Sequence, residues 1–298
     1  MIRFLVVISA ILFVFTAEAQ ETIKLMQYNL LNYGHNTSYC DQTNNEIDAK
    51  TNNIKTIIDH VMPDILVVNE MDNDLSDVIK LQGSALNVNS RDYYQSANIL
   101  NQQNSYTINM LYYDSRILSL VEQFSVSTWP RDINIYKMNY SENGNDIDFY
   151  VSVAHLKAGS DDDQARADMT GDFMNYISSH PSSENWIFAG DLNLYSANEQ
   201  AYQNLLNPSD GIRFLDPVNQ YGDWNNNSDF SDYHTQSTHY FDNGCASWSG
   251  LDSRFDFILI NDAVKGGNSG MEYVEYSYET IGQDGKHFND AVNYGTNN

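Results

Sequence analysis

The sequence has few basic residues and little cysteine or proline. Of its 298 residues, 15 are Lys or Arg against 40 Asp or Glu, so the formal net charge is −25. Such an acidic body repels phosphate polymers at long range and offers no basic footprint for nucleic acid. The charge instead fits a small or neutral-headed substrate, or a site in which a bound metal supplies the positive charge.

Long apolar runs are also scarce. One, Phe4 to Phe15, follows Arg3 and precedes the small-residue cleavage site Ala17-Glu18-Ala19. This order predicts a secretory signal peptide over residues 1–19. The run is too short for a comfortable membrane span, and no later stretch qualifies. We therefore expect an exported protein, extracellular or periplasmic, without stable membrane insertion; an uncleaved amino-terminal anchor is the alternative.

Nothing in the composition divides the remaining chain, residues 20–298. It contains no Pro-, Gly- or Ser-rich linker, internal repeat or charge block, which predicts one large domain. Cys40 and Cys245 are the only cysteines. Export would permit a disulfide between them, but the sequence alone does not say whether they meet.

The expected elements alternate between strands and helices at first and become β-rich in the middle. Apolar patterns predict strands at 22–31, 64–70, 106–113, 117–127, 133–140, 146–155, 186–189, 254–260 and 272–278. Helices are expected over 74–86 and 197–206. Two more should begin at Thr43, where Thr43 and Glu46 would form a capping box, and after Ser160, which would be the N-cap. The four runs between 106 and 155 are typical of an antiparallel meander. The order of elements indicates a layered α/β fold.

The stretch from Trp186 to Asn193 shows how a site could be organised. Its apolar residues predict a strand buried on both faces, after which Gly190 lets the backbone turn tightly. Asp191 and Asn193 project from the same side of the backbone at the carboxyl edge of the sheet. Taken alone, the pair is equally typical of an Asx-turn that closes a strand. Other predicted strands carry polar residues near an end, namely Asn29, Glu70, His155 and Asp256.

These residues would converge on one edge of a layered sheet, and their types suggest metal-assisted attack on a phosphoester. Glu70 would hold a hard divalent cation through oxygen. Asn29, Asn193 and a protonated His155 would donate hydrogen bonds to phosphate oxygens. Asp191 would orient the attacking water and accept its proton.

Five motifs in order resemble those of the endonuclease/exonuclease/phosphatase superfamily. They are Tyr28-Asn29-Leu30-Leu31, Pro63 to Glu70, Ser152 to Lys157, Gly190-Asp191-Leu192-Asn193 and Arg254 to Leu259. The resemblance implies a four-layer α/β sandwich with two central, mostly antiparallel sheets. It also implies phosphoester hydrolysis that depends on Mg²⁺, with Mn²⁺ or Ca²⁺ as possible substitutes.

The same resemblance implies roles for single residues. Glu70 would bind the metal, and Asn29 the metal or the phosphate. Asp191 and Asn193 would handle the nucleophile and the phosphate, and His155 would contact the phosphate. Tyr112 or Tyr113 falls where some members place a site residue, and Asp256 resembles the Asp that orients the catalytic His.

The closing Ser-Asp-His signature of the superfamily has no counterpart in this chain. The late candidate, Phe288 to Val292, carries Ala291 at the position of the His. We therefore expect the domain to be C-terminally incomplete, with its last strand missing, in preference to a natural inactive form. The sheet edge beside residues 254–260 should then be unpaired.

The expected function is that of a secreted, monomeric phosphodiesterase or phosphatase-like hydrolase. Its substrate would be a phosphoester, with a small molecule or lipid headgroup favoured over nucleic acid. One alternative is a secreted endonuclease that acts on DNA or RNA. Another is a non-catalytic extracellular binding protein on the same scaffold.

Overall fold

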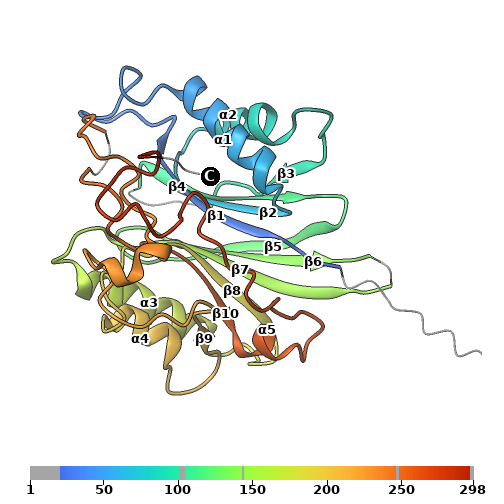
Figure 1. Cartoon of the computed structure of the whole chain (residues 1–298). Helices are drawn as coiled ribbons and strands as arrows, with labels where there is room; N and C mark the ends of the chain where they lie inside the picture. The colour runs from blue at the N-terminus through green and yellow to red at the C-terminus, as the bar shows by residue number, and fades with distance from the viewer. Residues whose placement is uncertain (1–20, 101–104, 143, 246–247, 296–298) are drawn as a thin grey trace, which may run out of the picture.

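The computed structural model describes residues 21–100, 105–142, 144–245 and 248–295. They form four layers, in which two β-sheets stack face to face and helices cover the outer face of each sheet (Figure 1). The four-layer α/β sandwich is therefore confirmed. None of the described helices has the length and apolar character needed to cross a bilayer. The predicted signal peptide, residues 1–19, lies outside the described residues.

The first sheet has the strand order β1-β2-β4-β3. Its strands are β1 (Leu25–Tyr33), β2 (Ile65–Asp72), β3 (Tyr94–Ser96) and β4 (Thr107–Asp114). The helices on its outer face are α1 (Ile47–Val61), α2 (Leu75–Leu81) and the π-helix η1 (Gln82–Leu86).

The second sheet has the strand order β5-β6-β7-β8-β10-β9. Its strands are β5 (Leu118–Val126), β6 (Ile133–Tyr140), β7 (Ile147–His155), β8 (Asn185–Asp191), β9 (Phe214–Leu215) and β10 (Asp256–Asn261). On its side of the molecule lie α3 (Asp163–Ile177), α4 (Gln200–Leu206) and α5 (Asp262–Gly266), and a 3₁₀ helix, η2 (Ser228–Tyr233), precedes β10. Among the strand pairs of the described residues, only β1–β2 and β7–β8 are parallel, so the sheets are mostly antiparallel, as expected.

Apolar clusters fill the spaces between the layers, and β2 shows how one strand serves two of them. Ile65 and Val67 point between the sheets, while Leu66 and Val68 point toward α1 and α2. All four side chains are fully buried. A strand between two layers needs apolar residues on both faces, which explains its continuous apolar run.

Several local predictions are wrong. The run at 106–113 forms β4 in the first sheet, so only β5, β6 and β7 make the meander. Residues 272–278 form no strand, and Tyr276 is 97% exposed, because the alternation there has no sheet to face. Helix α1 is capped by Glu46, whose carboxylate accepts from the backbone N–H groups of Asp48 and Ala49, whereas the Thr43 hydroxyl donates to Asp41 Oδ1. Ser160 does not cap α3, which begins at Asp163.

The expected open edge beside β10 is also wrong, because β10 pairs with β8 on one side and with β9 on the other. Among the described residues, β1 pairs with β2 alone. Strand β1 is therefore an edge strand of the first sheet in the described part of the chain.

Cys40 and Cys245 are joined by a disulfide, with their Cα atoms 4.4 Å apart. The bond connects the loop before α1 to the loop before β10. Beside it, Asn44 Nδ2 donates to Asn243 O at 3.0 Å. Loops from the two halves of the sandwich are thus tied together.

Candidate active site

Half of the candidate site comes from three neighbouring strands of the second sheet. His155 ends β7, Asp191 ends β8 and Asp256 begins β10, and the strand registers place His155 and Asp256 on either side of Asp191. Because β10 runs antiparallel to β8, its first residue lies at the same edge as the last residue of β8. The three side chains therefore meet at one edge of the sheet.

The other half comes from β1 and β2 in the first sheet. The ladder between them is interrupted after Asn29, and the β2–β4 ladder is interrupted between Val68 and Met71. At these bulges the backbone takes positive φ values, 48° at Leu31, 53° at Asn32 and 56° at Glu70. Left-handed conformations are unfavourable for Leu and Glu, and residues held in them cluster at functional sites. The bulges redirect Glu70 toward the second sheet.

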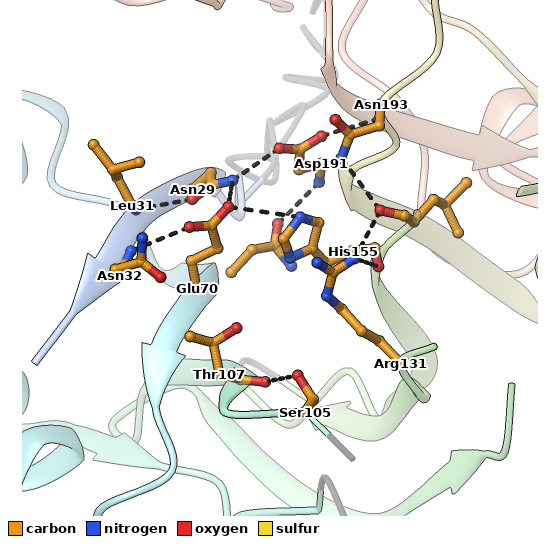
Figure 2. Close-up of polar contacts among 12 residues, drawn as sticks. Asn29, Leu31, Asn32, Glu70, Ser105, Thr107, Arg131, His155, Asp191 and Asn193 are labelled. Carbon is orange, nitrogen blue, oxygen red and sulfur yellow. Dashed lines mark hydrogen bonds and ion pairs between the residues drawn. The ribbon is translucent and has the colours of Figure 1, made fainter. Parts of the chain in front are cut away.

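Asn29 links the two halves directly. Its Nδ2 donates to Glu70 Oε1 at 3.0 Å and to Asp191 Oδ2 at 2.8 Å. Its Oδ1 accepts from the backbone N–H of Leu31 at 2.9 Å, and the N–H of Asn32 donates to Glu70 Oε2 at 3.2 Å. Figure 2 shows these side chains converging between the sheets.

A second asparagine, Asn69, lies fully buried beneath this group and also bridges the sheets. Its Oδ1 accepts from the backbone N–H of Asp191 at 2.9 Å and from Gln27 Nε2 at 2.8 Å. Its Nδ2 donates to Asn109 Oδ1 at 2.7 Å and to Ala154 O at 3.1 Å. These bonds fix the spacing of the sheets where the site is built.

Glu70, His155 and Asp191 form a group that can hold a metal ion. One ligand atom from each lies within 4.8 Å of the others. Asp256 adds a third carboxyl, whose buried Oδ1 has no hydrogen-bond partner in the described part of the chain. Among the described residues, no Lys or Arg comes within 4.0 Å of any of these carboxyls. A divalent cation fits this oxygen-rich group, because nothing nearby neutralises it by direct pairing.

The crowding of these carboxyls changes their acidity. Burial raises the pKa of Asp191 well above its usual range, repulsion from Asp256 and Glu70 adds to the rise, and the Asn29 hydrogen bond opposes it. Burial likewise raises the pKa of Asp256 to about 6, against hydrogen bonds from Thr235 and Gln27 that lower it. In the metal-free protein the site therefore resists full ionisation.

His155 differs from the prediction of a protonated imidazole. Burial lowers its pKa well below the usual value, and the nearby positive charge of Arg131 lowers it further. Its Nε2 lies 3.6 Å from Glu70 Oε1. A neutral imidazole can donate one hydrogen bond to a phosphate oxygen or bind a metal through its unprotonated nitrogen.

Asn193 and Gly190 shape the end of β8. The backbone N–H of Asn193, where φ is 49°, donates to Asp191 Oδ1 at 3.0 Å, and its Nδ2 donates to Leu156 O at 3.2 Å. Gly190 lies within the strand instead of making a tight turn. A Cβ there would lie 1.8 Å from Ala154 O, so glycine is required for the close approach of β7 and β8.

Tyr112 does not lie at the site. It is fully buried in the apolar core beside α1 and α2, and its hydroxyl donates to Val78 O at 3.2 Å. Strand β4 runs antiparallel to β2, so its first residue, Thr107, pairs with Asp72 near the site, whereas Tyr112 pairs with Leu66. Tyr113 pairs with Ile65, one residue farther away. The expected phosphate contact from either tyrosine does not fit this placement.

The prediction also missed Arg131 as a site residue. Arg131 Nη1 donates to Leu156 O at 3.1 Å, and the guanidinium lies beside His155 (Figure 2). Burial lowers the pKa of Arg131, whereas the charges of Glu70 and Asp191 raise it. Its position between Trp129-Pro130 and β6 carries no sequence signal for a site, because its contact with Leu156 depends on the start of β6 lying beside the end of β7. The prediction missed Asn69 as well, although a polar residue in an otherwise apolar strand is a usable signal for a buried hydrogen-bonding group near a site.

Comparison with solved structures finds the same fold in proteins of low sequence identity. An endonuclease/exonuclease/phosphatase family protein from Bacteroides thetaiotaomicron is 16% identical with a TM-score of 0.57, over 82% of this chain and 85% of that one. A mannosyl-6-phosphatase from the same species is 14% identical with a TM-score of 0.55, over 81% and 86%. The D. rerio protein TDP2, in complex with a single-stranded DNA product, is 14% identical with a TM-score of 0.54, over 81% and 84%.

No curated protein matches the chain at a significant level. The family model for the endonuclease/exonuclease/phosphatase family matches residues 26–274, which include all five sequence motifs and every residue of the site. The chain therefore belongs to the endonuclease/exonuclease/phosphatase family.

Proposed function

We propose that this protein is a secreted, Mg²⁺-dependent hydrolase of small phosphoesters. The observation that carries the proposal is the meeting of Glu70, His155 and Asp191 within 4.8 Å, at an edge built by both sheets. Glu70 and Asp191 would hold the cation, with Asn29 fixing both carboxylates. When bound, the cation would stabilise negative charge on the phosphate oxygens; Mn²⁺ or Ca²⁺ could substitute through the same oxygen ligands.

The side chains around this group have complementary tasks. Neutral His155 and the charged Arg131 would face the phosphate, one as a hydrogen-bond donor and the other through its positive charge. Asp191 would orient the attacking water and take its proton, and the rise in its pKa caused by burial favours acceptance of that proton. Asn193 would keep the Asp191 carboxylate in place through its backbone N–H.

The substitution Glu70→Gln tests the metal site. It keeps the shape of the side chain but removes the charge, so the affinity for Mg²⁺ should fall strongly while the fold is retained. Calorimetric titration measures the affinity for Mg²⁺, and hydrolysis of bis(p-nitrophenyl) phosphate measures the activity that depends on it. Glu122→Gln, at an exposed position on β5, is the matched control. Equal Mg²⁺ affinity of Glu70→Gln and the wild type would refute the assignment.

An endonuclease is the second candidate, because one structural neighbour carries a DNA product. The net charge of −25 favours the small substrate, since it repels a polyanion. A synthetic diester should therefore be hydrolysed faster than double-stranded DNA at physiological salt. Faster cleavage of DNA would select the nuclease, and binding without turnover of either substrate would select the non-catalytic binding protein.

We also propose that the acid/base imidazole expected beside Asp256 comes from chain beyond Asn298. The support is that no His among the described residues pairs with Asp256, although its Oδ1 is buried and unpartnered. The coding sequence downstream of Asn298 tests this: a Ser-Asp-His followed by an apolar strand is expected.

Export is tested by sequencing the amino terminus of protein recovered outside the cytoplasm, which should begin near Gln20. Light scattering tests the monomeric state.

A further inference from the structure

Lys50 on α1 occupies an unusual place behind the candidate site. Its Nζ donates to Leu31 O at 2.6 Å and to Leu30 O at 3.0 Å. Among the described residues it forms no ion pair with a carboxylate, although the sequence is rich in them. A lysine ammonium that is half-buried against two carbonyls is costly, because partial desolvation is not repaid by an opposite charge at contact distance. Burial lowers the pKa of Lys50 to about 8, against the charge of Glu70, which raises it.

Asn45 binds the same turn from the same side. Its Nδ2 donates to Leu31 O at 3.2 Å and to Asn32 O at 3.0 Å. Lys50 and Asn45 together therefore hold three consecutive carbonyls, those of Leu30, Leu31 and Asn32. These carbonyls belong to the bulge at the end of β1, where Leu31 and Asn32 have positive φ.

The opposite side of this turn faces the site. When its carbonyls point toward α1, its N–H groups point toward Asn29 and Glu70, which accept from Leu31 and Asn32 respectively. The backbone N–H of His35 also donates to Asn32 O at 3.2 Å, but Lys50 is the group that binds the carbonyls of both Leu30 and Leu31. Without Lys50, less would oppose the intrinsic cost of the left-handed conformation. The Asn29 and Glu70 side chains would then lose the two backbone donors that orient them.

We propose that Lys50, assisted by Asn45, is a positioning residue that holds the turn Leu30–Asn32 so that Asn29 and Glu70 are oriented for metal binding. The mechanical part of this proposal depends only on the turn. Its consequence for metal affinity rests on the proposed function. Groups that orient metal ligands from behind typically change metal affinity by about 10–100-fold when they are removed.

The test compares Lys50→Met with Lys55→Met. Both remove an ammonium from α1, but Lys55 forms an ion pair with Asp59 at 2.8 Å and does not contact the turn. Amide hydrogen exchange at Leu31 and Asn32, measured by NMR, should be at least about tenfold faster in Lys50→Met and unchanged in Lys55→Met. Lys50→Arg, which keeps a charged donor, should restore slow exchange. Asn45→Ala should shift exchange in the same direction by less, and it serves if Lys50→Met does not fold.

Metal titration adds a readout that a general loss of stability would not reproduce. In Lys50→Met the apparent affinity for Mg²⁺ should fall by about 10–100-fold, while the rate at saturating Mg²⁺ stays near that of the wild type. Wild-type exchange at Asn32 in both Lys50→Met and Asn45→Ala would overturn the proposal. So would a loss of rate that excess Mg²⁺ does not recover. If the wild type binds no divalent cation, the proposed function fails, and the exchange rates alone then decide the positioning role.

Discussion

Replacing Asp256 by Asn should stabilise the metal-free protein at neutral pH, although it removes a residue of the site. The Asp256 carboxyl has its pKa raised to about 6, chiefly by burial. A carboxyl with a higher pKa in the folded state binds its proton more tightly there than in the unfolded chain. Its contribution to stability is therefore present below about pH 4 and is lost as the pH rises through about 6.

The size of the effect follows from the shift. Moving from the ordinary value of 3.8 to about 6 is roughly two pKa units, and each unit corresponds to about 1.4 kcal/mol. Asp256→Asn removes the ionisation, so the gain should approach about 3 kcal/mol at pH 8 and vanish near pH 4. The unfolding entropy is about 2.1 cal/mol/K per residue, so in a chain of this length such a gain raises the melting temperature by roughly 5 °C.

Denaturant unfolding in EDTA between pH 4 and pH 8 measures this gain. Asp168→Asn is the matched control, because Asp168 is exposed on α3. In Asp256→Asn the pKa of Asp191 should also fall, since repulsion from Asp256 is the largest cause of its rise after burial. A difference in stability that does not change with pH, or a loss of stability at pH 8, would refute the reasoning.

Two further predictions concern the scaffold. Arg254 binds both carboxylate oxygens of Asp216, at 2.6 and 2.9 Å. Arg254→Met should destabilise the protein by about 3–5 kcal/mol in denaturant unfolding, because it leaves the buried Asp216 without its cation. The double variant with Asp216→Leu should recover much of that loss, and a loss below about 1 kcal/mol in the single variant would contradict the role of the pair. Gly190→Ala should cost about 3 kcal/mol and weaken Mg²⁺ binding, because its Cβ would force β8 away from Ala154 O and displace Asp191. Unchanged stability and affinity in that variant would show that the strands adjust freely.

The layers of the fold could be predicted because apolar periodicity reports which faces of an element are covered. The continuous apolar run that begins at Trp186 predicted a strand buried on both faces, and every residue of β8 is buried in the structure. The alternation at 272–278 misled because alternation alone does not provide a sheet to pair with. Glu46 caps α1 without Thr43 because its own side chain reaches the backbone N–H groups of Asp48 and Ala49.

The site could be predicted in part for a related reason. Asn29, Glu70, His155 and Asp191 lie near the carboxyl ends of parallel-paired strands, and such ends share an edge. Tyr112 was misplaced because its position depends on the direction of β4, which an apolar run does not reveal. The bridging bonds of Asn69 could not be predicted either, since they depend on which faces of the two sheets oppose each other.

The two halves of the site also imply how metal binding and pH act together. Glu70 belongs to the first sheet and Asp191 to the second, and Asn29 bonds to both. A cation held by both carboxylates would add a link between the sheets and would need Asp191 ionised, against the rise in its pKa. Stabilisation by a ligand grows with its concentration relative to the dissociation constant, and reaches about 2.7 kcal/mol at a hundredfold excess. Mg²⁺ should therefore raise the melting temperature at pH 8 and have little effect at pH 5. Equal stabilisation at both values would mean that the cation binds away from these carboxyls, because their protonation at pH 5 opposes binding at this site.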